Sequence, residues 1–380
     1  MGRTAGEVNK RKMYSYYDYS LLFLTLFLVC FGLVMIYSTS SYNAQRVYGN
    51  ATHYLERQAL FAGAGILVML FVSKIDYRIY IKKLPIIRIK PVTFLYFLCI
   101  GLQVYVLKFG EVINGAKRWI SLGALGSFQP SELTKVAVIL FTSYIVQLAP
   151  RKLDKFTGFL RIVFFIVPLL GLIVIENFST ALVVGVIMVA ICFVASKKKG
   201  YFVFSGILLV AAGALLVLFV PYRFERITVW QNVETHPKGY QILQGLYAIA
   251  SGGVFGKGLG ESMQKLGFIP ESHNDMIFSV ICEELGLFGA FALILLFILL
   301  IWRIFIIAIN APDLYGGLIA TGVLAHIAIQ VLINIAVVTN TIPSTGIPLP
   351  FISYGGSSVM VILFEMGIVL SISNQIKAER

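Results

Sequence analysis

The sequence predicts an all-α, polytopic integral membrane protein with about ten transmembrane helices and large extracellular loops. The chain has 380 residues, of which 58% are hydrophobic and only 13% charged, and its mean hydropathy is +0.86. Soluble domains carry about 25% charged residues, so this composition excludes a soluble globular protein. Long apolar stretches also recur along the whole chain, which a single membrane anchor would not require.

The apolar stretches are each long enough to cross a hydrocarbon core of ~30 Å at ~1.5 Å per helical residue. The first follows a basic segment, as a signal peptide would, but more spans follow it and we interpret it as an uncleaved helix. We treat residues 1–380 as one transmembrane domain. The predicted spans lie near residues 20–38, 58–73, 91–107, 131–148, 159–175, 179–196, 201–220, 276–302, 314–338 and 357–373.

The distribution of basic residues predicts the orientation. Most of the 31 Lys and Arg fall in segments that face the cytoplasm if the N-terminal tail, residues 1–19, is inside. The C-terminal tail, residues 374–380, is then also cytoplasmic. Three long irregular segments, 108–130, 221–274 and 341–358, face outward, and 221–274 is the large extracellular loop. Because binding sites are often built from loops on a rigid scaffold, we expect the active site on the extracellular side.

The net charge of +13 does not indicate a nucleic-acid partner. Most of it lies at span ends, where it complements anionic lipid head groups, and no basic and aromatic module stands apart from the spans. The four cysteines all fall within predicted helices, where a small apolar thiol is ordinary. Their spacing matches neither a disulfide framework nor a zinc site.

Two outer segments have unusual backbone chemistry. The run "GIPLPFISYGG" cannot form a regular helix, because Pro348 and Pro350 remove backbone donors and disfavour the α region before them. Non-helical backbone near membrane depth is expected to line a cavity or to be buried in protein. The glycine-rich run 252–260 lacks the Gly-Lys-Ser/Thr ending of a P-loop, so it does not by itself indicate a phosphate site.

The stretch "PESHNDMIFSVICEELG", residues 270–286, places titratable side chains at the lip of an apolar helix. One interpretation is that Asn274 or Asp275 is the helix N-cap, which is worth ~1 kcal/mol. The other is a functional site, because Glu271 and His273 lie just before Asp275. A helix start would keep Asp275 ionised, which suits a base or a metal ligand.

Glu283 and Glu284 are intramembrane acids, which are costly in lipid and therefore expected to face the bundle interior. We predict Lys135 and Arg118 as their ion-pair partners, with a direct catalytic role as the alternative. A two-carboxylate glycosidase site with Asp275 is excluded, because Glu283 lies ~12 Å further along the helix axis and such pairs need ~5–9.5 Å.

The segment "QPSELTK", residues 129–135, predicts a helix start. Ser131 is expected to cap the helix, Glu132 lies in its first turn, and Lys135 follows at i+3. We interpret Glu132 and Lys135 as structural polar residues within the membrane.

Basic residues on the outer side form a second candidate site, because Arg and Lys bind phosphate and Arg does so through a bidentate fork. Ordinary contact with lipid phosphates is the alternative interpretation for each of them. The neighbouring Trp119 is equally compatible with an interfacial anchor. The basic residues are Lys117, Arg118, Arg223, Arg226 and Lys257.

Several of these segments resemble the SEDS family of shape, elongation, division and sporulation proteins, which includes FtsW, RodA and SpoVE. The resemblance is carried by "NGAKRWISLG", "FQPSELTK", "GLGESMQKLGFIPESHNDMIFSVICEELG" and "GIPLPFISYGGSS", in this order, and it spans essentially the whole chain. The third segment is nearer to the FtsW division and sporulation branch than to the elongation branch. Two positions depart from the family pattern: Asn274 stands in place of a threonine and Asn177 in place of an acid.

The resemblance implies a peptidoglycan glycosyltransferase of the bacterial cytoplasmic membrane, which polymerises lipid II into glycan strands at the outer face during division or cell-shape maintenance. It implies a class B penicillin-binding protein as the cross-linking partner, together with other divisome or elongasome membrane proteins. The family's essential aspartate corresponds to Asp275, and its motif Trp and Arg to Trp119 and Arg118. No organic cofactor is expected, although a divalent cation, Mg²⁺ or Mn²⁺, could be held by Asp275 with Glu271.

A diphosphate is already a good leaving group, so this chemistry needs one base and nearby cations rather than two carboxylic acids. We therefore hypothesise that Asp275 is the general base or the carboxylate that binds an activating metal. Two alternatives stay open: a lipid II flippase, and a non-catalytic scaffold that recruits the penicillin-binding protein. The residues assigned to substrate binding are Lys117, Arg118, Trp119, Lys257, Glu271 and His273.

Overall fold

A computed structural model describes residues 13–84, 88–113, 116–121, 123, 126–207 and 221–379. Within these ranges nine helices are long and apolar enough to cross a membrane, which confirms the predicted all-α membrane fold. The predicted span 201–220 is described only as far as residue 207, where it is helical, and the rest lies outside the described residues. The nine helices are α1 (Tyr19–Tyr48), α2 (His53–Val72), α3 (Pro91–Phe109), α4 (Pro130–Leu148), α5 (Phe156–Glu176), α6 (Phe178–Ala195), α10 (Ile277–Ile309), α11 (Leu314–Val338) and α12 (Gly356–Asn374).

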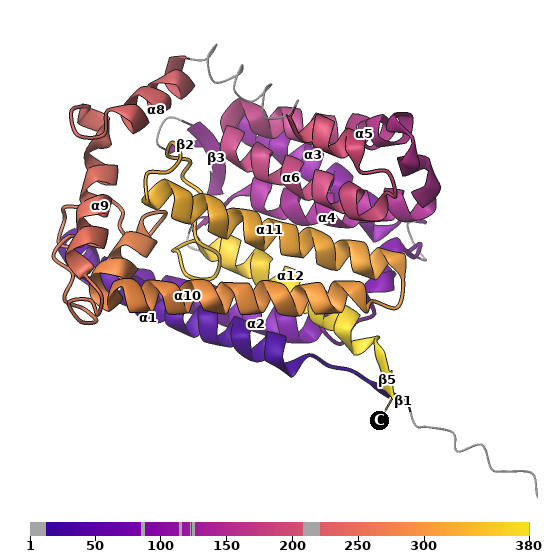
Figure 1. Cartoon of the computed structure of the whole chain (residues 1–380), viewed down its shortest axis with the longest axis horizontal. Coiled ribbons are helices and arrows are strands. Elements are labelled where there is room, and N and C mark those ends of the chain that lie inside the picture. The colour runs from indigo at the N-terminus through magenta and orange to yellow at the C-terminus, as the bar shows by residue number, and fades with distance from the viewer. Residues whose placement is uncertain are drawn as a thin grey trace, which may run out of the picture.

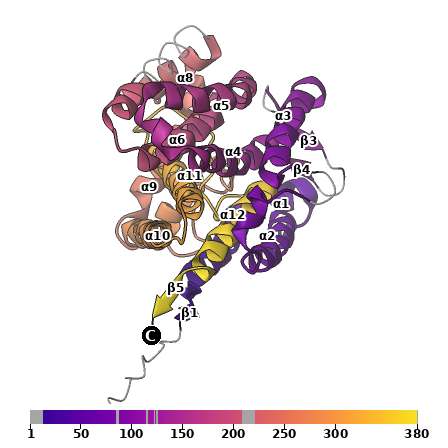
Figure 2. The same ribbon diagram turned by 90° about the vertical axis from the view of Figure 1, so that its right-hand side faces the viewer.

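The spanning helices lie side by side in one bundle (Figures 1 and 2). Helix α11 packs against α10, α6 and α4, while α12 packs along α2, and α1 contacts both α2 and α10. Most of α4, α11 and α12 is buried, whereas α2, α3, α5 and α10 expose most of their apolar residues, as helices that face lipid do. The centre of the bundle is therefore formed by α4, α11 and α12.

The two ends of the bundle differ in structure (Figure 1). At one end, β1 (Met13–Ser15) pairs antiparallel with β5 (Lys377–Glu379), which brings the two ends of the described chain together. The opposite end carries α8 (Pro221–Gln231), α9 (Tyr240–Gly252) and a small antiparallel sheet of β2 (Glu111–Ile113), β3 (Ala116–Ser121) and β4 (Ser127–Phe128). Short 3-10 helices, η1 (Tyr77–Ile81), η3 (Pro150–Asp154) and η4 (Pro237–Gly239), complete the connections.

Two predicted helix caps are wrong. Helix α10 begins at Ile277, after Met276, with no side-chain cap, so neither Asn274 nor Asp275 caps it. Helix α4 begins at Pro130 rather than after Ser131, because proline is favoured in the first turn, where its missing N–H costs nothing.

The glycine-rich run 252–260 packs against a break in α10. At Gly286 the helix backbone turns to φ 68° and ψ −168°, a region that only glycine occupies readily. Four hydrogen bonds between the run and the break replace the interrupted helical pairs, so the glycines serve close backbone approach. They join Lys257 N to Glu283 O (3.0 Å), Gly258 N to Glu284 O (2.9 Å), Leu287 N to Gly253 O (2.9 Å) and Phe288 N to Val254 O (3.1 Å).

Replacement of Gly286 by alanine is expected to lower the melting temperature of the purified protein substantially. A Cβ there would lie 2.3 Å from the Gly256 backbone nitrogen, and the backbone conformation alone costs ~1–3 kcal/mol for another residue. Gly171→Ala in α5 is the matched control, since a Cβ there meets nothing within 4 Å. Thermal unfolding in detergent that shows equal shifts for the two variants would contradict the role assigned to the break.

Candidate active site

A cavity of about 400 Å³ lies at the end of the bundle that carries the small sheet. Its walls come from β3, the start of α4, α8, residues 271–275 and the non-helical loop 344–355, which are far apart in sequence. A smaller cavity of about 90 Å³ shares several of these residues and continues toward Lys135 and Gln330. The loops predicted to carry function therefore meet over the centre of the bundle.

Asp275 is held at this cavity by its backbone. The side-chain Nδ2 of Asn334, on α11, donates one hydrogen bond to the carbonyl oxygen of Asp275 (2.8 Å) and another to that of Ile347 (2.9 Å). One amide thus joins the segment before α10 to the non-helical loop. Gly346 (φ 70°) lies opposite the carboxylate, and a Cβ there would be 4.0 Å from Asp275 Oδ2.

Further hydrogen bonds join the same two segments. Ser353 Oγ donates to the carbonyl oxygen of Asn274 (2.7 Å), and the Tyr354 N–H donates to that of His273 (2.9 Å). Gln58 on α2 accepts a hydrogen bond at Oε1 from the Gly355 N–H (3.1 Å). The prediction that the proline-containing loop lines a cavity is confirmed, and its buried polar groups find partners in the neighbouring segments.

Burial raises the pKa of Asp275 from its ordinary value of 3.8 to about 6. Nearby Glu271 raises the pKa further, whereas Arg226 lowers it. The helix start that was expected to keep this carboxylate ionised does not act on it, because α10 begins two residues later and desolvation dominates the pKa shift. A pKa of about 6 leaves the group largely ionised at neutral pH yet able to accept a proton, as suits a general base.

Two arginines line the cavity with Asp275. Arg118 Nε donates to the carbonyl oxygen of Glu176 (3.0 Å), and Arg226 Nη1 donates to that of Ser344 (2.9 Å). These bonds to backbone carbonyls hold the guanidinium groups at the cavity wall. Arg226 belongs to the outer basic set but was not assigned to substrate, because only the tertiary structure brings α8 to the cavity.

The two lysines assigned to diphosphate lie elsewhere. Lys117 is exposed on β3 and does not line the cavity beside its neighbour Arg118. Lys257 Nζ lies 2.6 Å from Glu283 Oε1, outside the cavity lining. The structure thus places Arg118 and Arg226, rather than these lysines, beside Asp275.

The neighbours of Asp275 in sequence have different environments. His273 is buried between the rings of Tyr54 and Tyr354, with centroid distances of 4.4 and 5.5 Å, and it does not line the cavity. Burial lowers the pKa of His273 to about 4, so it is neutral and packs as an aromatic group. Glu271 does line the cavity and accepts a hydrogen bond from Asn274 Nδ2 (2.8 Å).

Trp119 and a buried ion pair form the inner wall of the two cavities. Trp119 and Glu132 line both, and Lys135 lines the smaller one. Lys135 Nζ lies 2.9 Å from Glu132 Oε1, with both side chains almost fully buried, so the two residues at i and i+3 form an ion pair inside the bundle. The floor below Asp275 is therefore polar but charge-balanced at this pair.

Glu283 and Glu284 each pair with a lysine from the loop that precedes α10. Glu283 contacts Lys257 and accepts a further hydrogen bond from the Ser262 hydroxyl. Glu284 Oε1 lies 2.8 Å from Lys265 Nζ and 2.6 Å from Ser38 Oγ on α1. These bonds tie the loop to both α10 and α1.

The predicted partners of these two acids, Lys135 and Arg118, are wrong. Lys135 pairs with Glu132 on its own helix, and Arg118 lies at the cavity wall. The acids do avoid lipid, as predicted, but they do so by facing the loop, which supplies its own cations. Glu283 and Glu284 do not line the cavity with Asp275, in agreement with the exclusion of a carboxylate pair.

Comparison with known sequences identifies the family. The sequence model of the FtsW, RodA and SpoVE proteins, described as "Cell cycle protein", matches residues 19–378. The chain belongs to this family. It is 41% identical over 376 residues to stage V sporulation protein E of Bacillus subtilis, covering 94% of this chain and 96% of that protein. It is also 38% identical over 365 residues to the probable peptidoglycan glycosyltransferase FtsW of Geobacter sulfurreducens, with coverage of 95% and 96%.

Solved structures share the fold. A chain from work on "structural coordination of polymerization and crosslinking by a peptidoglycan synthase complex" is similar, with a TM-score of 0.77, 27% identity and coverage of 95% of this chain and 98% of that one. The rod shape determining protein RodA of Thermus thermophilus is similar with a TM-score of 0.70, 26% identity and coverage of 95% and 97%. The sporulation and division relatives agree with the branch that the sequence favours.

One departure from the family pattern has a structural role here. Asn177 accepts a hydrogen bond at Oδ1 from the Thr180 N–H (3.1 Å) and is the N-cap of α6. An amide at this position therefore performs the capping function that an acid could also perform. Asn177 lines the smaller cavity beside Arg118 without adding a negative charge.

Lys265→Met is expected to destabilise the protein by ~3–5 kcal/mol, because it leaves the fully buried Glu284 carboxylate without its cation. Adding Glu284→Gln to this variant should recover most of the loss. Lys238→Met is the matched control, since its ion pair with Glu225 is exposed to solvent and should contribute little to stability. Thermal or denaturant unfolding in detergent measures the differences, and similar losses for the two single variants would refute the assignment.

Proposed function

We propose that the chain is a peptidoglycan glycosyltransferase that polymerises lipid II, with Asp275 as the general base. The observation that supports this most directly is the Asp275 carboxylate, with its pKa raised by burial to about 6, in a cavity that two arginines also line. The family and its peptidoglycan glycosyltransferase relatives give the reaction class. The cavity supplies the groups that this reaction needs.

In the proposed reaction, a sugar hydroxyl oxygen forms a bond to the anomeric carbon of a second, lipid-linked saccharide. The bond from that carbon to the diphosphate oxygen breaks, and the diphosphate leaves with the electron pair. Asp275 accepts the hydroxyl proton as the new bond forms, and Arg118 and Arg226 stabilise the charge on the departing diphosphate. Trp119 offers an apolar face to sugar or lipid at the cavity wall.

A divalent cation, Mg²⁺ or Mn²⁺, stays part of the proposal as an aid to the leaving group. Among the described residues no group of three or more His, Cys, Asp or Glu gathers to hold a metal. Asp275 and Glu271 are two carboxylates on the same cavity, so they could hold a cation together with diphosphate oxygens from the substrate. Such a cation would neutralise developing charge on the diphosphate.

We place both termini in the cytoplasm and the cavity at the outer face of the membrane. The support is the excess of Lys and Arg at the end of the bundle where β1 and β5 meet, according to the positive-inside rule. The cavity lies at the opposite end. A lipid-linked disaccharide presented in the outer leaflet would then reach Asp275 directly.

We further propose a class B penicillin-binding protein as the cross-linking partner, within a larger assembly of division or elongation proteins. The similar chain from a complex that coordinates polymerization and crosslinking supports this partner. A polymerase that releases uncross-linked strands needs a transpeptidase close by. Co-purification of the two proteins is the direct measurement.

Asp275→Asn is expected to reduce polymerisation of labelled lipid II at least ~100-fold, because a positioned base contributes ~10²–10⁴-fold. Glu261→Gln is the control, since it removes an exposed carboxylate from the same loop without touching the cavity. The assay is gel analysis of glycan strands made by purified protein with its transpeptidase. If a folded Asp275→Asn variant makes glycan strands at the normal rate, Asp275 is not the general base and the proposal is wrong.

The pH dependence of kcat/KM should show one acidic limb with a midpoint near pH 6. Below this pH the Asp275 carboxylate is protonated and cannot accept the hydroxyl proton, so kcat/KM falls ~10-fold for each pH unit. Above this pH kcat/KM should not change with pH. Arg226→Gln should move the midpoint upward, because Arg226 lowers the pKa of Asp275. A limb near pH 4, the ordinary aspartate range, would contradict the burial of the base.

A further inference from the structure

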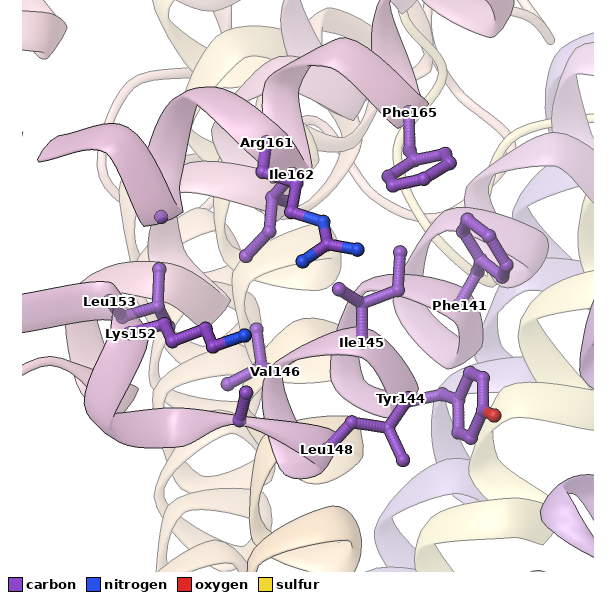
Figure 3. A pocket seen from close by; sticks show the side chains of 12 residues that line it. Phe141, Tyr144, Ile145, Val146, Leu148, Lys152, Leu153, Arg161, Ile162 and Phe165 are labelled. Carbon is purple, nitrogen blue, oxygen red and sulfur yellow. The ribbon is translucent and has the colours of Figure 1, made fainter. Parts of the chain in front are cut away.

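A second cavity, of about 360 Å³, lies between α4 and α5 at the end of the bundle away from the candidate active site (Figure 3). Helix α4 begins at the active-site cavity with Glu132 and ends at this second cavity with residues 141–149. The proposed reaction does not use it. Most of its wall is apolar, formed chiefly by Phe141, Ile145, Val146, Leu148, Ile162 and Phe165.

Two cations point into this apolar space. The ammonium group of Lys152, on η3, and the guanidinium group of Arg161, on α5, both extend toward its centre (Figure 3). Neither side chain makes an ion pair or hydrogen bond with any residue in the described ranges, and no lining residue is acidic. The cavity therefore combines an apolar wall with uncompensated positive charge.

The position of Lys152 is fixed by close packing of η3 against the first turn of α5. A Cβ on Gly158 would lie 2.0 Å from the carbonyl oxygen of Lys152, so only glycine allows this approach. Leu153 is buried next to it and anchors η3 to the bundle. The lysine is thus presented by a defined turn rather than by a free loop.

One wall residue, Tyr144, is held from its other side by a cation. Lys90 Nζ, just before α3, donates to the Tyr144 hydroxyl (2.6 Å) and lies 4.5 Å from the centre of its ring. Tyr144 is itself part of the cavity wall. Lys90 itself does not line the cavity, so the positive charge inside it comes from Lys152 and Arg161.

The membrane makes this arrangement costly without an anionic partner. Arg161 lies five residues into α5, or ~7.5 Å along the helix, in a segment long and apolar enough to span the bilayer. A guanidinium at such depth is unfavourable unless it reaches water or pairs with an anion. The long Arg161 side chain can extend from there toward the membrane surface, where lipid phosphates lie and match Arg and Lys donors well.

We propose that this cavity is a binding site for an anionic phospholipid. Its phosphate contacts Arg161 and Lys152, and one acyl chain follows the apolar wall between α4 and α5. An anionic head group such as that of phosphatidylglycerol fits better than a zwitterionic one, which would bring its own cation into the basic cluster. A free phosphate ion would leave the apolar wall without a ligand.

The test is quantitative lipid analysis of the full-length protein, purified in mild detergent from nanodiscs that contain equal phosphatidylglycerol and phosphatidylcholine. Lys152→Gln with Arg161→Gln should reduce retained phosphatidylglycerol several-fold relative to the unmodified chain. Arg151→Gln with Lys155→Gln is the matched control, since these two charges are exposed, as Lys152 and Arg161 are, but do not line the cavity. The control should retain the lipid.

A second variant tests the shape of the cavity separately from its charge, and its melting temperature shows whether the protein is still folded. Ile145→Trp fills the cavity but keeps both cations, and it should also lose the lipid while the melting temperature stays within a few degrees. Equal loss in the cavity and control variants would show only diffuse surface attraction and overturn the proposal. Retention of phosphatidylglycerol by both double charge variants would also overturn the proposal. The same holds if the site binds inorganic phosphate alone, or if protein from native membranes preferentially retains a polyprenyl phosphate.

Discussion

The candidate site depends on the pairing of two non-helical segments, residues 271–276 and 344–355, through buried polar groups. A single amide, that of Asn334, hydrogen-bonds to the backbone of both segments and fixes them at the same depth. Ser353 and Tyr354 add two more bonds to the first segment. Because an unpaired backbone group at this depth costs several kcal/mol, each segment can remain irregular only while the other satisfies it. The hydrogen bonds between the two segments therefore hold Asp275 in position.

The same constraint explains how the large loop before α10 is held. Its glycines complete the hydrogen bonds that α10 loses at Gly286, and its lysines neutralise Glu283 and Glu284. Backbone and charge are thus satisfied within one structural unit, which leads directly into the segment that carries Asp275. The intramembrane acids belong to the support of the site and are not part of its chemistry.

Positive charge is used differently at the two ends of the bundle. Beside Asp275, the guanidinium groups of Arg118 and Arg226 are fixed by bonds to backbone carbonyls and face a polar cavity. At the other end, Lys152 and Arg161 face an apolar cavity between the central helix α4 and the lipid-facing helix α5. The first arrangement suits a diphosphate that is bound and released, and the second suits a phosphate that stays attached to a lipid.

The sequence alone determined the membrane class, the nine described spans and the involvement of the proline loop in a cavity. These follow from local properties: apolar length and the chemistry of proline. The tertiary structure decided which lysines meet Glu283 and Glu284, that His273 is aromatic packing, and that Arg226 rather than Lys117 or Lys257 reaches Asp275. Those outcomes depend on how loops far apart in sequence fold over the bundle, which residue spacing does not encode. The raised pKa of Asp275 likewise depends on its burial in the folded protein.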